Sequence, residues 1–297
     1  MEYALGIDLG GTNVKAIAVT AKGRVLAETS IPTGGAMDAQ WQAAVRLAAA
    51  KVQAKAKHPA AWIGVAAPGL PARDQRSIVS LPARLPGLEG LDWRRFFSVK
   101  DAVPVLNDAQ AALLGEIWLG AARRSRNAIL LTLGTGVGGA AQVDGNLLRG
   151  HLGRAGHLGH ISLNPAGERD IVRTPGSLED AIGDCTVSVR TGGRFASTAD
   201  LVAASLRGDP DARQVWQESI CALAAAIASL INVLDPQTVI IGGGIAKSGA
   251  ALFVPLRRQL ARFEWRPGGA HVRIVAAQLG DRAGAFGAAW HARNFRA

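Results

Sequence analysis

The apolar positions of the chain follow two alternating patterns. Short apolar segments rich in β-branched residues predict strands, and longer stretches with apolar residues three and four positions apart predict helices. The first two predicted strands, residues 3–9 and 14–19, flank a Gly-Gly pair and should form a hairpin. Further strands are expected at residues 62–67, 103–106, 127–133, 140–143 and 238–241, and helices at residues 38–57, 109–119, 211–234, 249–263 and 283–293. Strands that alternate with helices in two blocks predict an α/β fold with two lobes.

The composition is that of a folded protein with a sizeable core. Hydrophobic residues make up 48% of the 297 residues and charged residues 19%, which excludes a disordered chain. No apolar run reaches the roughly 18 to 20 residues that cross a bilayer, and the chain does not open on the basic and apolar stretches of a secretory signal. The two cysteines, Cys185 and Cys221, form no C-x-x-C spacing. We therefore expect a cytoplasmic protein with no membrane partner.

The charge is strongly basic, with Lys+Arg 33 against Asp+Glu 23 and a net charge of +10. Such an excess attracts phosphate groups of any kind, including nucleotides, polyphosphate and nucleic acids. The basic residues are scattered along the sequence, so a solvated basic surface is favoured over a nucleic-acid partner.

A first glycine-rich loop follows the first predicted strand and contains Asp8, Gly10, Gly11, Thr12 and Lys15. Glycines let backbone N–H groups approach the oxygens of a phosphate, and Thr12 adds a hydroxyl donor. Asp8 could hold Mg²⁺ through a water molecule, and Lys15 could contact a phosphate. A tight hairpin turn without a ligand is the alternative for this segment.

Two further glycine-rich loops follow predicted strands. The loop at residues 133–139 lacks the Lys-Ser or Lys-Thr of a P-loop, and a strand rather than a helix follows it, so a phosphate-cradling hairpin is expected. The loop at residues 242–244 precedes a helix and suits a flat ligand such as adenine. The nucleotide-binding candidates in the two loops are Gly134, Thr135, Gly136, Gly138, Gly243 and Gly244.

A carboxylate beside an amide, Asn107-Asp108, lies where a strand meets a helix. A carboxylate placed there can accept a proton from a substrate hydroxyl. An ordinary helix N-cap is the alternative, because Asp is a preferred capping residue. With the three loops present, the general base is the favoured interpretation.

Together these motifs resemble the sugar-kinase, hsp70 and actin superfold and, within it, glucokinase-type members of the ROK family. The resemblance extends over residues 8–15, 107–108, 133–139 and 242–246. It implies a two-lobed α/β (ribonuclease H-like) fold with a cleft between the lobes, a small lobe of residues 1–107 plus 284–297 and a large lobe of residues 108–283. It also implies a homodimer.

The resemblance implies an ATP-dependent hexose kinase that transfers the γ-phosphoryl group to a sugar hydroxyl, by default O6 of glucose. Polyphosphate is the other donor that the resemblance allows. Asp108 would be the general base, Asn107 a sugar contact and Asp8 the holder of Mg²⁺. A winged-helix repressor of the same family is not expected, since Asp8 lies only eight residues into the chain.

The sequence departs from the family pattern in the sugar loop. Where the family has Gly-Glu-x-Gly-His, this chain has His157 in place of the Glu and keeps the final His160. Losing a charge-assisted contact costs about 1.5–3 kcal/mol, or roughly 10- to 150-fold in affinity. His160 and Glu179 remain expected sugar contacts, together with His157. A pseudokinase that binds sugar and nucleotide without turnover is the alternative function.

The cysteines of the family's zinc site are also missing. The stretch that corresponds to Cys-x-Cys-Gly-x-x-Gly-Cys runs from Asp170 to Ser177 and holds no cysteine, so we expect no structural zinc. Another group must then fix the tautomer of His160, and Asp170 is the candidate. A metal cluster of His151, His157 and His160 is a less favoured alternative.

Overall fold

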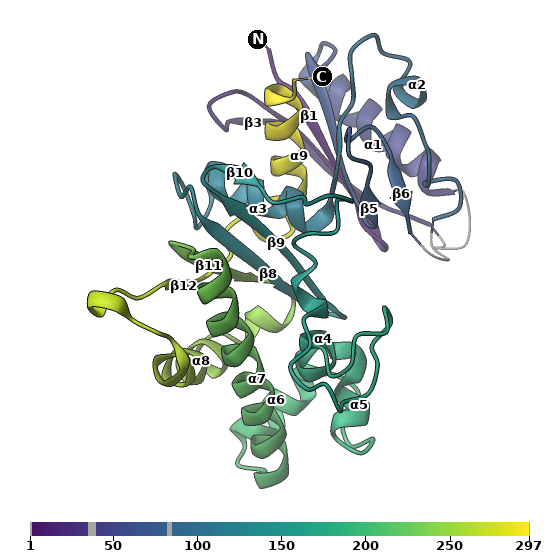
Figure 1. The fold of residues 1–297 in the computed structure, drawn as a ribbon. Coiled ribbons are helices and arrows are strands. Elements are labelled where there is room, and N and C mark those ends of the chain that lie inside the picture. Colours follow the sequence, from purple (N-terminus) through teal and green to yellow (C-terminus); the bar gives the residue numbers. More distant parts are fainter. Residues whose placement is uncertain (1, 35–39, 82–84, 297) are drawn as a thin grey trace. The chain divides into compact units, whose positions relative to one another are not determined.

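The computed structural model describes residues 2–34, 40–81 and 85–296. The chain folds into two compact units, each built on a five-stranded sheet (Figure 1). The first unit comprises residues 1–124, 149–155 and 278–297, and the second comprises residues 125–148 and 156–277. The lobe boundaries expected at 107–108 and 283–284 stay a prediction. The two compact units divide the chain at other residues and place α3 (Asp108–Leu119) with the N-terminal sheet.

The sheet of the first unit has the order β3-β2-β1-β4-β7. Strand β2 is antiparallel to both β1 and β3, whereas β4 is parallel to β1 and β7 is parallel to β4. The parallel strands therefore end at the same edge of the sheet. The strands are β1 (Ala4–Leu9), β2 (Asn13–Val19), β3 (Val25–Pro32), β4 (Trp62–Ala67) and β7 (Val105–Asn107), and β5 (Leu70–Pro71) pairs separately with β6 (Ile78–Ser80).

Helices cover both faces of this sheet. On one face, α1 (Gln40–Ala56) packs its buried Trp41 and Val45 into the same core as the alternate β1 residues Leu5 and Ile7. The predicted start of this helix, residue 38, lies outside the described residues. On the other face, α9 (Ala283–Asn294) contacts β1, β2 and β4 and packs against α3. The short α2 (Trp93–Phe97) is capped by Asp92.

Helix α9 lies unusually close to the sheet. A Cβ atom at Gly6 would collide with the carbonyl oxygen of Ala285, and one at Gly64 would collide with that of Ala288. Glycine at both positions is therefore a packing requirement, because a backbone carbonyl cannot move aside without disturbing the helix. This close packing fixes the position of α9 beside the end of β1.

The second unit repeats the strand pattern of the first. Its sheet has the order β10-β9-β8-β11-β12, with three antiparallel strands followed by two parallel ones. The strands are β8 (Ala128–Leu133), β9 (Val137–Val143), β10 (Asn146–Leu147), β11 (Thr238–Gly242) and β12 (Arg273–Ala276). The helices are α4 (Leu178–Ile182), α5 (Val187–Arg190), α6 (Thr198–Leu206), α7 (Pro210–Leu234) and α8 (Ala250–Phe263).

Helix α7 is long and apolar enough, by length and composition alone, to cross a membrane, which corrects the expectation that no such segment exists. However, 50% of its most apolar window is buried inside the structure, and the helix packs against α4, α6 and α8. That setting is typical of a core helix in a folded domain.

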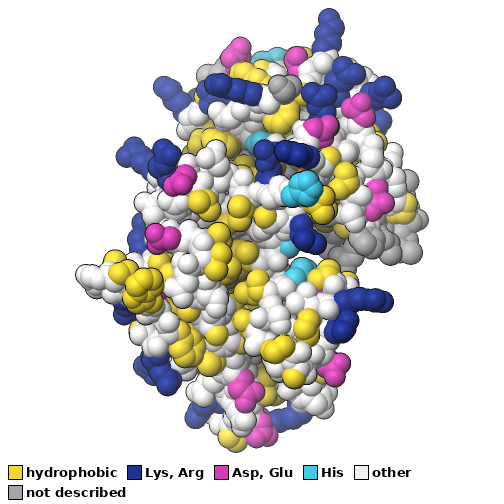
Figure 2. Space-filling model, viewed as in Figure 1, with side chains coloured by type: hydrophobic (Ala, Val, Ile, Leu, Met, Phe, Trp, Pro, Cys, Tyr) yellow, Lys and Arg dark blue, Asp and Glu magenta, His cyan; other side chains and the backbone are white. Residues whose placement is uncertain are grey.

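Lys and Arg side chains are spread over the face drawn in Figure 2, with Asp and Glu side chains among them. No large single-sign patch stands out on this face, as expected for a solvated basic surface. The absence of a nucleic-acid partner stays a prediction.

Candidate active site

The first glycine-rich loop is the turn between β1 and β2, as the hairpin prediction required. The Gly10 N–H donates to Asn13 O at 3.0 Å, which closes the turn. Thr33 holds the loop from the side: its N–H donates to Thr12 O at 2.9 Å and its hydroxyl to Gly10 O at 2.7 Å. Because Thr33 is fully buried, the loop has a fixed shape, and Gly11 borders open space.

Asp8 lies near the end of β1, opposite Lys15 in the hairpin. Burial raises the pKa of Asp8, and the negative charges of Asp108 and Asp281 raise it further, while Lys15 lowers it; the result is a pKa of about 7. Lys15 Nζ also lies 3.8 Å from Asp281 Oδ2. The first unit thus brings the predicted residues Asp8, Lys15 and Asp108 together. Asp281, which was not predicted, belongs to the same group of charges.

The amide and carboxylate at residues 107 and 108 end β7 and begin α3. Asn107, not Asp108, is the N-cap: its side-chain oxygen accepts from Ala109 N at 3.0 Å, and Gln110 completes a capping box. The Asn107 amide donates to Gly69 O at 3.1 Å. Asp108 is exposed in the first helical turn, and its Oδ1 accepts from Ala109 N at 2.8 Å. The capping role and the carboxylate therefore belong to two different residues.

The second glycine-rich loop lies between β8 and β9 and contacts Glu179 on α4. Glu179 Oε2 accepts from Val137 N at 2.9 Å, and a Cβ atom at Gly136 would collide with the same oxygen. The Gly134 N–H donates to Gly136 O at 3.0 Å within the turn. Thr135 contributes its carbonyl oxygen to Cys185 N at 2.8 Å. A predicted phosphate loop and a predicted sugar contact are thus direct neighbours.

The third glycine-rich loop follows β11 and lies against the second. Gly243 has φ +88°, and a Cβ there would collide with the carbonyl oxygen of Leu133, so only glycine fits. Gly244 borders open space, as does Gly134 in the second loop. The strand pairing of β11 with β8 brings these two loops to the same edge of the second sheet, with Gly138 at the start of β9.

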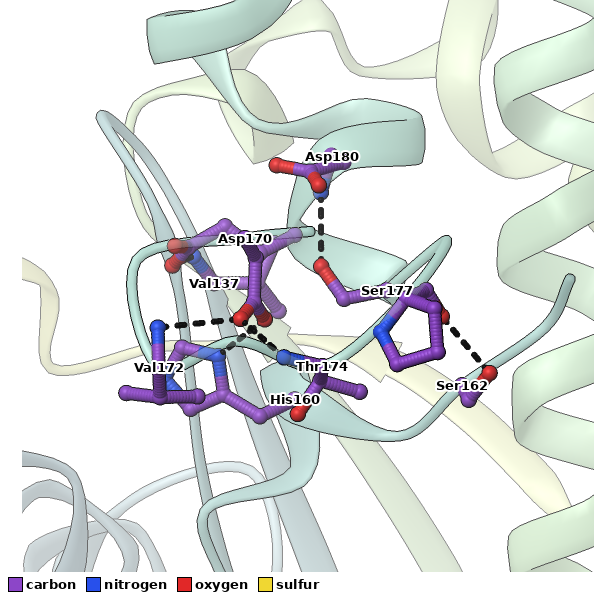
Figure 3. Close-up of polar contacts among 10 residues, drawn as sticks. Val137, His160, Ser162, Asp170, Val172, Thr174, Ser177 and Asp180 are labelled. Atoms are coloured by element: carbon purple, nitrogen blue, oxygen red, sulfur yellow. Dashed lines mark hydrogen bonds and ion pairs between the residues drawn. The ribbon is translucent and has the colours of Figure 1, made fainter. Parts of the chain in front are cut away.

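The histidine loop at residues 156–160 also belongs to the second unit. A Cβ at Gly159 would collide with the carbonyl oxygen of Val137, so this loop packs directly on the start of β9. His160 Nδ1 lies 2.8 Å from Asp170 Oδ2, which confirms the predicted partner (Figure 3). His157 precedes the short 3₁₀ turn that carries His160.

Asp170 is held by several donors in a fully buried position. Its Oδ1 accepts from Val172 N at 3.0 Å and from Thr174 N at 2.8 Å, and Ser177 adds a side-chain hydrogen bond. Burial alone would raise the pKa of Asp170, but the hydrogen bonds from His160, Thr174 and Ser177 outweigh it and hold the pKa below its ordinary value. Asp170 is therefore an ionised carboxylate at neutral pH.

Within the described residues, no group of three or more His, Cys, Asp or Glu side chains is arranged to hold a metal ion directly. His151 belongs to the first unit, and His157 and His160 belong to the second. Mg²⁺ held through water is a different case, because it needs few direct protein ligands. The oxygen donors around Asp8, whose charges repel one another, fit such an ion.

Two contributors were not found from the sequence. Asp281 lies in the turn before α9, more than 270 residues after Asp8 in the chain, and its charge raises the pKa of Asp8. No sequence motif marks Asp281. Thr33 follows β3, and only its buried hydroxyl in the structure reveals that it supports the first loop.

Two sheets of the same strand order, each with a glycine-rich turn between its first two strands, define a protein of the sugar kinase, hsp70 and actin class. The ROK family profile matches residues 4–294, and the chain belongs to the ROK family. The predicted fold class and the predicted family are thus confirmed.

Relatives of the chain include sugar kinases. The chain is 31% identical over 331 residues to a glucokinase of Streptomyces coelicolor, covering 99% of this chain and 98% of the relative. The ROK hexokinase of Thermus thermophilus has a TM-score of 0.87 at 29% identity, with 98% of each chain covered. A ROK glucokinase of Streptomyces griseus, solved with glucose and AMPPNP, has a TM-score of 0.81 at 28% identity, covering 99% of this chain and 100% of that one. These likenesses make the protein a sugar kinase.

Proposed function

We propose that the protein transfers the γ-phosphoryl group of ATP to a hydroxyl of a hexose, by default O6 of glucose, with Asp108 as the general base. The observation that carries this proposal is the placement of Asp108. It is an exposed carboxylate in the first turn of α3, next to an Asn107 whose side chain is fixed by two hydrogen bonds. A carboxylate there can take the proton of a hydroxyl that Asn107 helps to orient.

The charges around Asp8 support the phosphate end of the reaction. Burial and the charges of Asp108 and Asp281 disfavour the ionised form of Asp8, and the charge of Lys15 offsets part of this effect. Mg²⁺ bound near Asp8 would neutralise charge on the transferred phosphate. Asp8 would hold it through water, and Lys15 and Thr12 would contact phosphate oxygens. Phosphoryl transfer depends mainly on such positioning and charge stabilisation.

The second unit supports nucleotide and sugar binding. Gly134, Thr135, Gly136 and Gly138 would contact phosphates through the backbone, and Gly243 and Gly244 would lie against the adenosine. The sugar contacts that we propose within this unit are His157, His160 and Glu179. That Glu179 bonds the backbone of the second loop supports a coupled arrangement of sugar and phosphate sites.

The proposal extends to a cytoplasmic homodimer, supported by the family alone. Analytical ultracentrifugation tests the oligomeric state: a single species near twice 30.8 kDa is expected, and a monomer at micromolar concentration would overturn this part.

The experiment is phosphorylation of a panel of hexoses and amino sugars followed by ³¹P NMR, with Mg-ATP and with polyphosphate as donors. We expect a sugar 6-phosphate with ATP, and the product spectrum names both the sugar and the hydroxyl. No product from either donor, with nucleotide and sugar still binding, would replace the kinase with the pseudokinase, for which His157 in place of a carboxylate is the supporting feature.

A further inference from the structure

The loop from Asp170 to Ser177 folds around a single buried carboxylate. The Asp170 side chain has 0% exposure and receives hydrogen bonds from one histidine ring, two backbone N–H groups and one hydroxyl. Its own N–H donates to Thr174 O at 3.0 Å, which closes the loop. Figure 3 shows His160, Val172 and Thr174 converging on this carboxylate. Such a set of donors is what a buried carboxylate requires.

The carboxylate determines which nitrogen of His160 carries the proton. An ionised carboxylate only accepts hydrogen bonds, so the nitrogen facing it, Nδ1, must be the donor. In the neutral ring, Nε2 then keeps its lone pair and is an acceptor. The His160 side chain is 22% exposed, so the ring is anchored on one side and reaches solvent on the other.

The same loop connects His160 to Glu179. Ser177, which bonds Asp170, is also the N-cap of α4, where its Oγ accepts from Asp180 N at 3.2 Å. Glu179 is in the first turn of that helix and bonds Val137 N. Leu178 N donates to Ile161 O at 3.0 Å, which ties the helix to the residue after His160. One buried carboxylate therefore organises two of the predicted sugar contacts.

We propose that Asp170 is a positioning residue for the sugar site. Its carboxylate holds His160 as the Nδ1–H tautomer, and His160 Nε2 then accepts a hydrogen bond from a hydroxyl of the sugar. This role rests on the proposed sugar kinase function, but the tautomer can be measured without turnover. Asp170 occupies the first position of the stretch where the family pattern has a cysteine, so this chain organises its loop with a carboxylate.

The decisive variant is Asp170→Asn. The Asn oxygen can still accept from Val172 N and Thr174 N, but its amide presents a donor to His160. His160 Nδ1 must then become the acceptor, which moves the ring proton to Nε2. We expect the sugar KM to rise on the order of 10-fold, because one hydrogen bond to the sugar is lost. The KM for ATP should stay unchanged.

Two measurements test the proposal: the tautomer of His160 and the KM for the sugar. Long-range ¹H–¹⁵N NMR of the histidine ring nitrogens should show Nδ1–H for His160 in the wild type and Nε2–H in Asp170→Asn. Asp74→Asn is the matched control, since Asp74 also accepts from the N–H two residues on, at 3.1 Å, and has no hydrogen bond to a histidine among the described residues. For the KM, the variant is His160→Asn, whose amide can still donate to Asp170 but which lacks Nε2. Adding Asp170→Asn to it should change the sugar KM by less than about twofold.

An unchanged His160 tautomer in Asp170→Asn would overturn the proposal, and so would a changed tautomer with an unchanged sugar KM. If Asp170→Asn does not fold, His160→Asn decides instead: a sugar KM equal to that of the wild type would refute the acceptor role of Nε2. Absence of turnover in the wild type with every sugar and donor would refute the proposed function, and the NMR spectra would still decide whether Asp170 fixes the tautomer.

Discussion

Replacing Asp8 by Asn should make the ligand-free protein more stable at pH 8. Asp8 is partly buried near Asp108 and Asp281, and its pKa is raised from 3.8 to about 7 by burial and by these charges. The folded state therefore keeps a proton on Asp8 at pH values where the unfolded chain has lost it. Protonation stabilises the fold at low pH, and this contribution is lost as the pH rises from about 4 to about 7.

The expected magnitude follows from the size of the pKa change. A difference of about three units corresponds to about 4 kcal/mol at pH 8 and, by the same linkage, to about 2 kcal/mol at pH 5. Asn has the size of the neutral acid and does not ionise, so these values are upper limits on the stability that Asp8→Asn gains. At about 2 °C per kcal/mol, the Tm advantage of the variant should grow by about 5 °C between pH 5 and pH 8.

The assay is differential scanning calorimetry at pH 5, 6, 7 and 8 in EDTA, without nucleotide or sugar. Asp101→Asn, which changes an exposed carboxylate of the same unit, is the control and should stay close to the wild type at every pH. Added Mg²⁺ should then stabilise the wild type more than Asp8→Asn, because the ion needs the ionised carboxylate. A Tm difference that does not change with pH would refute the raised pKa and the repulsion behind it.

Three other variants test the packing and the sugar loop. Glu116→Gln should lower the free energy of unfolding by about 1–3 kcal/mol, because the buried carboxylate accepts from Ala121 N, Gln278 N and Leu279 N; an unchanged urea midpoint would contradict this. Gly6→Ala should lower the Tm by several degrees, since its Cβ would collide with Ala285 O, and an unchanged Tm would show that α9 can shift freely. His157→Glu should lower the glucose KM roughly 10- to 150-fold, and a higher KM would show that the pocket is built for a different sugar.

The sequence was informative where local chemistry decides the structure. The Gly-Gly pair between two β-branched segments predicts the hairpin of β1 and β2, and the glycines after β8 predict a second one. Strand β3 was not predicted, because only one of its eight residues is buried and its polar residues do not alternate with apolar ones. The shared strand order of the two sheets was not predicted either, since it is a repeat of topology and not of sequence.

The site was predictable in its motifs and not in its electrostatics. The structure adds that Asp8, near the end of β1, and Asp108, directly after β7, lie at the edge where these parallel strands end. The effect of Asp281 on Asp8 depends on how α9 packs against the sheet, which no local pattern gives. Likewise, the sequence could not tell that the capping side chain of α3 is that of Asn107 and not that of Asp108.

The most direct test of the proposed chemistry is the kcat of Asp108→Asn with saturating sugar and Mg-ATP, measured as ADP release. We expect kcat to fall by 10²–10⁴-fold, on the order of what a positioned general base contributes, while sugar and nucleotide dissociation constants stay within a few-fold of the wild type. Asp101→Asn, the exposed carboxylate used above, should keep the wild-type kcat. A kcat for Asp108→Asn within tenfold of the wild type would show that another group takes the proton.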